Sequence, residues 1–321
     1  MNMVNHSSTI SVVIPVYNGE AFIAKAVHSV LSQSRRPDQV LVVNDGSRDG
    51  TLAALKPFGD QITVISLPNG GAASARNAGI RAATSDVIAF LDADDSWHHD
   101  KLECQMAALA RYPEVGFTCC NFITKFLKTG QTVELLAYYP KGLVLNFDEP
   151  LKRSALELLL ECNVVGTCSN VLIRRSVLDQ VGIFNTAYRQ SEDYDLWLRC
   201  ALVTPFLIQK DVLLEKVSHD HNLTGNFAET LKFHEQVLLN FQRDNASHPA
   251  VRALASAFRR SLAQTRYDVG NLVFNAGRKL EAFGWFWRGL VTRPTFDNLL
   301  KFGWHSMKKL IRVLSFDTIK R

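Results

Sequence analysis

An Asp92-Ala93-Asp94 triplet follows the apolar run 86–91 in this chain of 321 residues. In an extended segment, residues i and i+2 point to the same side, so the two carboxylates can share one cation. Hard oxygen ligands suit Mg²⁺ or Mn²⁺, which leave coordination positions open for phosphate oxygens. A solvated acidic turn that caps the next helix is the alternative, and the triplet alone favours it.

Two further groups could bind a phosphorylated or nucleoside ligand. Asp45 lies in the turn sequence 44–47, where its carboxylate can accept a hydrogen bond from a nucleobase or a ribose, or simply form the turn. Arg76 lies in the small-residue segment 69–79, and its planar guanidinium can pair with Asp92 or with phosphates. A solvated arginine on a plain helix is the alternative.

Carboxylates and histidines also occur in the second half of the chain. Glu192 and Asp193 open a predicted helix, where acidic residues are common because of the helix dipole alone. A carboxylate there can also act as a general base toward an acceptor hydroxyl. His219 and His221 follow a predicted strand, and neutral imidazole can bind a metal or contact a phosphate. A surface histidine is the alternative interpretation.

The elements that must position these groups alternate between strand and helix. Apolar, β-branched runs predict strands at 10–16, 39–43, 61–66 and 86–91. Amphipathic or small-residue segments predict helices at 20–33 and 72–83, with a short one beginning near residue 51. Short connections between them predict an α/β fold with a mostly parallel sheet, whose ligands bind at the carboxyl ends of the strands. Asp45 and residues 92–95 lie at two such ends.

The second half of the chain has a more mixed pattern. Strands or hairpins are predicted within 115–140, strands at 170–174 and 212–217, and helices at 151–161 and 192–203. From residue 228 onward the helical period dominates. The helices predicted there are 228–243, 249–266, 268–276, 279–291 and 295–314.

Composition excludes several classes of protein. The chain is 47% hydrophobic and 21% charged, which is typical of a globular protein and excludes disordered and collagen-like classes. No apolar run approaches the roughly 18 residues that span a bilayer. The N-terminus lacks the features of a signal peptide, so a cytoplasmic location is expected. The six cysteines form no C-x-x-C pair, which argues against zinc.

Five segments, in this order, resemble those of the family 2 glycosyltransferases: SVVIPVYNGE (11–20), VNDGSRDGT (43–51), NGGAASARNAGI (69–80), AFLDADD (89–95) and SEDYDLWLR (191–199). The resemblance covers about residues 10–225. It implies a GT-A fold, which has a Rossmann-like sheet with flanking helices, and a nucleotide-sugar donor. The GT-A domain is expected at 1–227, with a donor half at about 1–115 and an acceptor half at about 116–227, followed by a helical extension at 228–321.

The resemblance also implies roles for individual residues. Seven are expected to bind the donor nucleotide: Pro15, Tyr17, Glu20, Asp45, Arg76, Asp92 and Ala93. Asp94 matches the direct ligand of Mn²⁺ or Mg²⁺, and His219 matches a late histidine near the metal, with His221 left open as the alternative. Asp193 matches the catalytic base, with Glu192 beside it. Asn44 stands where many members of the family have aspartate.

These roles lead to an expected reaction. The family inverts the anomeric carbon, and the Q-x-x-R-W sequence of processive synthases is absent, so transfer of a single sugar is expected. The donor is expected to be UDP-linked, and the acceptor a glycan or lipid-linked hydroxyl in cell-surface polysaccharide synthesis. The alternative is a non-catalytic module that keeps the fold and binds a nucleotide sugar or a membrane surface.

The C-terminal region is basic. Residues 246–321 carry 14 lysines and arginines against 4 acidic residues. Basic residues interleaved with aromatic ones favour peripheral contact with an anionic surface, such as the inner face of the plasma membrane. A helical bundle with a solvated basic face is an equal alternative. No motif supports nucleic-acid binding. The aromatic residues concerned are Phe283, Trp285, Phe286, Trp287, Phe296, Phe302 and Trp304.

Overall fold

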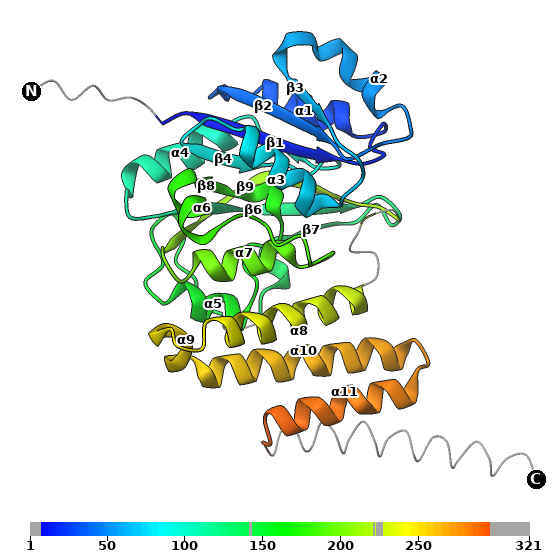
Figure 1. The fold of residues 1–321 in the computed structure, drawn as a ribbon, viewed down its shortest axis with the longest axis vertical. Helices are drawn as coiled ribbons and strands as arrows, with labels where there is room; N and C mark the ends of the chain where they lie inside the picture. The colour runs from blue at the N-terminus through cyan, green and yellow to red at the C-terminus, as the bar shows by residue number, and fades with distance from the viewer. Residues whose placement is uncertain (1–7, 141–142, 221, 223–226, 296–321) are drawn as a thin grey trace, which may run out of the picture. The chain divides into compact units, whose positions relative to one another are not determined.

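The structure is a computed structural model that describes residues 8–140, 143–220, 222 and 227–295. The chain divides into two compact units, Met1–Asn222 and Leu223–Arg321. In its described residues, the first unit is built on a nine-stranded sheet of order β3-β2-β1-β4-β8-β6-β9-β5, with β7 paired to β6 (Figure 1).

The first four strands are all parallel to one another. They are β1 (Ile10–Val16), β2 (Gln39–Asn44), β3 (Thr63–Ser66) and β4 (Val87–Phe90). The helices that follow them are α1 (Ile23–Leu31), α2 (Thr51–Leu55) with the 3₁₀ turn η1 (Lys56–Gln61), and α3 (Ala72–Ala82). Every residue of β1 and β4 is buried, as expected for strands covered on both faces.

Helix α3 lies close against β1 because its residues are small. A Cβ atom at Gly79 would lie 2.3 Å from the Val13 Cγ1 atom, so only glycine fits there. This close approach brings Arg76, one turn earlier on α3, to the carboxyl edge of the sheet.

The later strands turn the sheet into a mixed one. They are β5 (Ser96–Trp97), β6 (Phe117–Phe126), β7 (Thr132–Glu134), β8 (Leu172–Arg174) and β9 (Phe206–Ser218). Strand β8 lies antiparallel between β4 and β6, whereas β6 and β9 are parallel. Strand β9 begins six residues before its predicted start, because it pairs with β6 on both sides of an irregularity between Cys120 and Phe122.

Helices and 3₁₀ turns connect these strands. They are α4 (Lys101–Arg111), η2 (Leu135–Tyr138), α5 (Ala155–Glu161), η3 (Cys168–Asn170), α6 (Arg175–Val181) and α7 (Glu192–Cys200). The helix predicted from residue 151 begins at Ala155, because the Ser154 hydroxyl caps it by accepting a hydrogen bond from the Glu157 amide.

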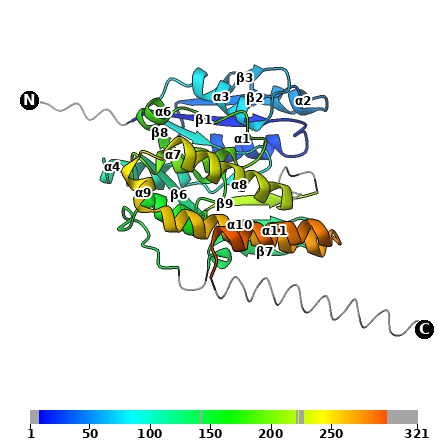
Figure 2. The ribbon, with the colours of Figure 1, turned by 60° about the horizontal axis from the view of Figure 1, so that its bottom comes forward.

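The second unit is helical. Its described helices are α8 (Phe227–Asp244), α9 (Pro249–Ala253), α10 (Ala255–Asn275) and α11 (Lys279–Thr292). Figure 2 shows α10 and α11 side by side. The helix break predicted at residue 267 is wrong. Gly270 lies within α10 without ending the helix, and the chain breaks instead at Leu254.

Some aromatic residues of the basic region form the core of this unit. Trp285 and Phe286 are buried with Tyr267 and Val273, whereas Phe283 and Trp287 are about half exposed. The helix predicted at 295–314 lies outside the described residues apart from its first residue, as do Phe296, Phe302 and Trp304. Within the part of the chain that is described, no helix is both long and apolar enough to cross a membrane.

Candidate active site

The acidic loop after β4 is held by a serine from a distant segment. The Ser169 hydroxyl donates to the Asp95 carboxylate (2.6 Å) and accepts from the Asp92 amide (2.9 Å). The Val217 amide donates to the other Asp95 oxygen at 3.0 Å. Burial, and then the charges of Asp94 and Asp92, raise the pKa of Asp95 well above its usual range. Asp95 is therefore an anchor of the loop.

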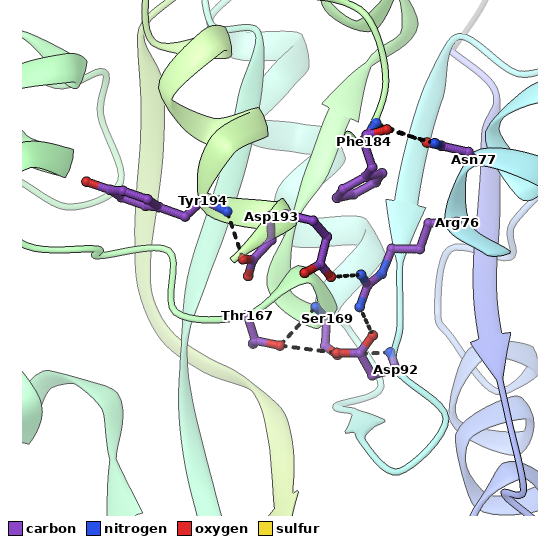
Figure 3. A network of polar contacts seen from close by, with 9 residues as sticks. Arg76, Asn77, Asp92, Thr167, Ser169, Phe184, Asp193 and Tyr194 are labelled. Carbon is purple, nitrogen blue, oxygen red and sulfur yellow. Dashed lines mark hydrogen bonds and ion pairs between the residues drawn. The ribbon is translucent and has the colours of Figure 1, made fainter. Parts of the chain in front are cut away.

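Arg76 joins this loop to the start of α7. One terminal nitrogen donates to Asp92 at 2.7 Å, and the other donates to Glu192 at 2.6 Å (Figure 3). The guanidinium carbon lies 5.4 Å from the centre of the Phe184 ring. The arginine side chain is only 7% exposed, so it is not the solvated arginine of the alternative interpretation.

Asn77 fixes the segment that carries Phe184. Its side-chain amide donates to the Phe184 carbonyl at 2.8 Å and accepts from the Phe184 amide at 2.9 Å. This closed pair of hydrogen bonds ties the acceptor half to α3 and places the aromatic ring against Arg76 (Figure 3). Neither Asn77 nor Ser169 was predicted as a site residue, because their partners are separated from them by 70 residues or more in the sequence.

Asp193 is the second residue of α7 and follows Glu192 of the ion pair. Its carboxylate accepts a hydrogen bond from the Tyr194 amide at 2.7 Å, and it is partly exposed where Glu192 is buried. Burial, and then the charge of Glu192, raise the pKa of Asp193 to about 6. The residue before the helix, Ser191, has a positive φ of 61°. Strained backbone of this kind clusters at functional sites. A carboxylate with these properties can accept a proton near neutral pH.

Asp94 and His219 lie together, as predicted for a metal pair. The His219 Nε2 atom is 3.1 Å from an Asp94 oxygen, and the same oxygen accepts from the Asn222 side chain at 2.8 Å. The His219 ring stacks on Phe22 with centroids 4.8 Å apart. Asn222 was not predicted, and His221 lies outside the described residues.

The Asp94 carboxylate and the His219 imidazole fit a divalent cation for which solvent or substrate supplies most of the ligands. Among the described residues, no group of three His, Cys, Asp or Glu side chains could enclose a metal ion. One carboxylate and one imidazole leave positions for water and phosphate oxygens, which is how Mg²⁺ usually binds. Burial, and then the charge of Asp92, raise the pKa of Asp94. A cation would relieve this repulsion.

Asp45 is buried at the end of β2, where it holds a glycine turn. Its two carboxylate oxygens accept hydrogen bonds from the Gly70 and Gly71 amides, both at 2.8 Å. The alternative interpretation of Asp45 was that its side chain forms the turn 44–47. The Asn44 side chain forms this turn instead, because it accepts a hydrogen bond from the Ser47 amide at 3.0 Å. Each Asp45 oxygen keeps a lone pair for a further donor.

The remaining predicted residues lie on the first βα loop and the acidic loop. Pro15 is buried in β1, just past the last paired residues of β1 and β4, so its missing N–H breaks no ladder bond. Tyr17 is 49% exposed. Glu20 is exposed and accepts a hydrogen bond from the Gly50 amide, which braces two loops. Ala93 packs against the main hydrophobic core of the first unit.

The fold is that of the GT-A glycosyltransferases. S. aureus TarS 1–349, solved in complex with UDP-GlcNAc, is similar with a TM-score of 0.56 at 15% identity, over 85% of this chain and 89% of that one. The mannosyltransferase PcManGT of Pyrobaculum calidifontis, in complex with GDP-Man and Mn²⁺, gives a TM-score of 0.56 at 18% identity, over 98% and 88%. At these identities the likeness concerns the fold alone.

The sequence comparisons then give the family. The model of glycosyl transferase family 2 matches residues 11–182, so the chain belongs to this family, and the predicted resemblance is confirmed. TuaG of Bacillus subtilis, named for teichuronic acid biosynthesis, is 33% identical over 61% of this chain and 73% of its own length. The Escherichia coli enzyme WfgD, named UDP-Glc:alpha-D-GlcNAc-diphosphoundecaprenol beta-1,3-glucosyltransferase, is 31% identical over 59% and 68%.

A further set of relatives comes from Rickettsia. The uncharacterized glycosyltransferase RT0329 of Rickettsia typhi is 28% identical over 75% of this chain and 74% of its own length. RC0461 of Rickettsia conorii is a longer protein, and the match spans only 35% of it.

Proposed function

We propose that this protein transfers one sugar, with inversion, from a nucleotide-sugar donor to a hydroxyl group of a glycan or lipid-linked acceptor. The observation that carries the proposal is the Arg76 network, which joins Asp92 at the donor end to Glu192, the residue before Asp193. The same side chain therefore binds a donor-side carboxylate and the residue next to the proposed base.

The residues have separate tasks in this reaction. Asp193 takes the proton of the acceptor hydroxyl as its oxygen bonds to the anomeric carbon, and the bond from that carbon to the diphosphate breaks with its electron pair left on the phosphate oxygen. Asp45 accepts a hydrogen bond from the nucleoside, with Pro15 and Tyr17 at the pocket opening. Asp94 and His219 would hold Mn²⁺ or Mg²⁺, which supplies positive charge to the departing diphosphate.

A UDP-linked donor has support from one sequence relative and one solved structure of similar fold. WfgD is named for a UDP-Glc donor and a diphosphoundecaprenol acceptor, and TarS was solved with UDP-GlcNAc. GDP is the main alternative nucleotide, because PcManGT was solved with GDP-Man. By analogy with WfgD and TuaG, we place the reaction in cell-surface polysaccharide synthesis.

A lipid-linked acceptor would be met at a membrane surface, so we also propose peripheral contact with the inner face of the plasma membrane. The half-exposed rings of Phe283 and Trp287 and the exposed Arg288 and Arg293 on and beside α11 support this. Co-sedimentation of the full chain with phosphatidylglycerol vesicles, but not with phosphatidylcholine vesicles, is the expected result. Equal recovery with both would contradict it.

Thermal unfolding tests the donor site directly. We expect one of UDP, GDP, dTDP and CMP to raise the melting temperature only when Mn²⁺ is present, because a ligand that binds the native state stabilises it by mass action. Asp94→Asn should abolish the metal-dependent part of the shift. Release of the nucleoside diphosphate from the matching nucleotide sugar then separates an enzyme from a non-catalytic binding module. A shift without any turnover would favour the module, and no shift would contradict the donor site.

A further inference from the structure

Lys216 is a partly buried lysine on β9, three residues before His219. Its ammonium group forms no hydrogen bond or ion pair with any residue that the structure describes. The neighbouring cations are different, because Lys25 and Lys125 both pair with Glu215. Successive residues of a strand point to opposite faces, so Lys216 points away from the Glu215 cluster.

The acidic loop after β4 lies next to this lysine. The residue that follows it, Val217, donates its amide to Asp95 at 3.0 Å, and His219 reaches Asp94 at 3.1 Å. The charge of Lys216 also acts on this loop. Burial raises the pKa of Asp94 and of Asp95, and Lys216 is among the groups that oppose the rise.

The ammonium group of Lys216 has unused hydrogen-bond donors. A lysine carries three N–H donors, and a partly buried charge without a hydrogen-bonded partner is costly. Arg76 could compete for an anion, but its two terminal nitrogens are engaged by Asp92 and Glu192. An anionic ligand at the acidic loop would therefore find its hydrogen-bond donors at Lys216.

We propose that Lys216 binds the diphosphate of the donor and stabilises it as it departs. The inference rests on the proposed function, because that function brings a diphosphate to the loop that carries Asp94. When the bond to the anomeric carbon breaks, the electron pair stays on the terminal phosphate oxygen, so the diphosphate gains negative charge. A fixed cation binds this product and the transition state more tightly than the intact donor, which accelerates the chemical step.

The test compares the full-length protein with Lys216→Met and Lys216→Arg. With Mn²⁺ present, we expect Lys216→Met to weaken UDP binding by about 10- to 100-fold and to leave uridine binding unchanged, because only UDP carries the phosphates. We expect Lys216→Arg to restore most of the UDP affinity. In turnover, kcat should fall more than KM rises. Thermal unfolding without ligand confirms that each variant is folded.

Lys125→Met is the matched control, because this lysine lies one strand away and pairs with Glu215 instead. It should bind UDP within about twofold of the wild type. If Lys216→Met binds UDP like the wild type, the lysine only balances the charge of the acidic loop and the inference is overturned. Equal weakening of uridine and UDP would overturn it as well. If the wild type binds neither UDP nor GDP, the proposed function fails first, and the inference fails with it.

Discussion

Arg76 on α3 and Glu192 at the start of α7 form a buried ion pair, with a nitrogen–oxygen distance of 2.6 Å, although 116 residues separate them in the sequence. The same guanidinium binds Asp92 after β4. The pair therefore connects two segments that are far apart in the sequence, and it holds the start of α7, where Asp193 follows Glu192.

Replacement of Arg76 tests this connection. In Arg76→Met, the buried Glu192 carboxylate loses its counter-ion, and breaking a buried pair in this way costs about 3–5 kcal/mol. We expect the free energy of unfolding in urea to fall by about that amount. Arg76→Lys should recover little, because an ammonium cannot present a planar fork to two carboxylates. The double variant Arg76→Met/Glu192→Gln should lose less than the sum of the single variants, and strict additivity would show that the pair is not coupled.

Replacement of Asp193 tests the base. Asp193→Asn keeps the shape of the side chain but cannot take the proton from the acceptor hydroxyl. We therefore expect kcat to fall by about 10²- to 10⁴-fold. Binding of the nucleoside diphosphate with Mn²⁺ should stay unchanged. Asp179→Asn, an exposed aspartate on α6, is the control and should keep full activity. Normal turnover by Asp193→Asn would rule out this residue as the base.

The pH dependence of transfer follows from the same carboxylate. Burial and then the Glu192 charge raise the pKa of Asp193 to about 6. A general base works only when ionised, so kcat/KM should be level near pH 8, fall through half its maximum near pH 6, and drop about tenfold per unit below that. Glu192→Gln removes a negative neighbour and should move this limb to lower pH. If the position of the acidic limb of the kcat/KM profile depends on neither Asp193 nor Glu192, another group titrates.

Strands β1 to β4 were largely predictable from the sequence. The run that forms β4 is apolar throughout and that of β1 is apolar apart from Ser11, and the turn residues after β2 and β4 mark the strand ends where Asp45 and Asp92 lie. Short βα connections leave a parallel sheet as the natural arrangement. The acceptor half was not predictable in this way. Strand β8 has only three residues, and its antiparallel position between β4 and β6 depends on pairing across the chain.

The supporting residues of the site could not be read from the sequence either. Ser169, Asn77 and Asn222 are polar residues whose types do not indicate what they contact, although Asn77 lies within the family-like segment 69–80. Each acquires its role from a partner on a distant segment, such as the Asp94 carboxylate that binds Asn222 from 128 residues away. Periodicity reports which face of an element is buried, and it carries no information on which distant polar group will meet that face.

Asn77 gives the last prediction. In Asn77→Ala, the buried amide and carbonyl of Phe184 lose their partners, at a cost of about 1–3 kcal/mol for each unsatisfied group. We expect a lower free energy of unfolding in urea and, at a temperature where the variant is folded, a lower kcat, because the ring of Phe184 no longer fixes Arg76. Asn77→Asp keeps the acceptor and loses the donor, so its defects should be intermediate.

Asn185→Ala, whose exposed side chain accepts only from the Ala187 amide, is the matched control. If Asn77→Ala unfolds like the control while kcat alone falls, the residue acts on the reaction without holding the two halves together. If neither quantity changes, the role assigned to the hydrogen-bonded pair is wrong.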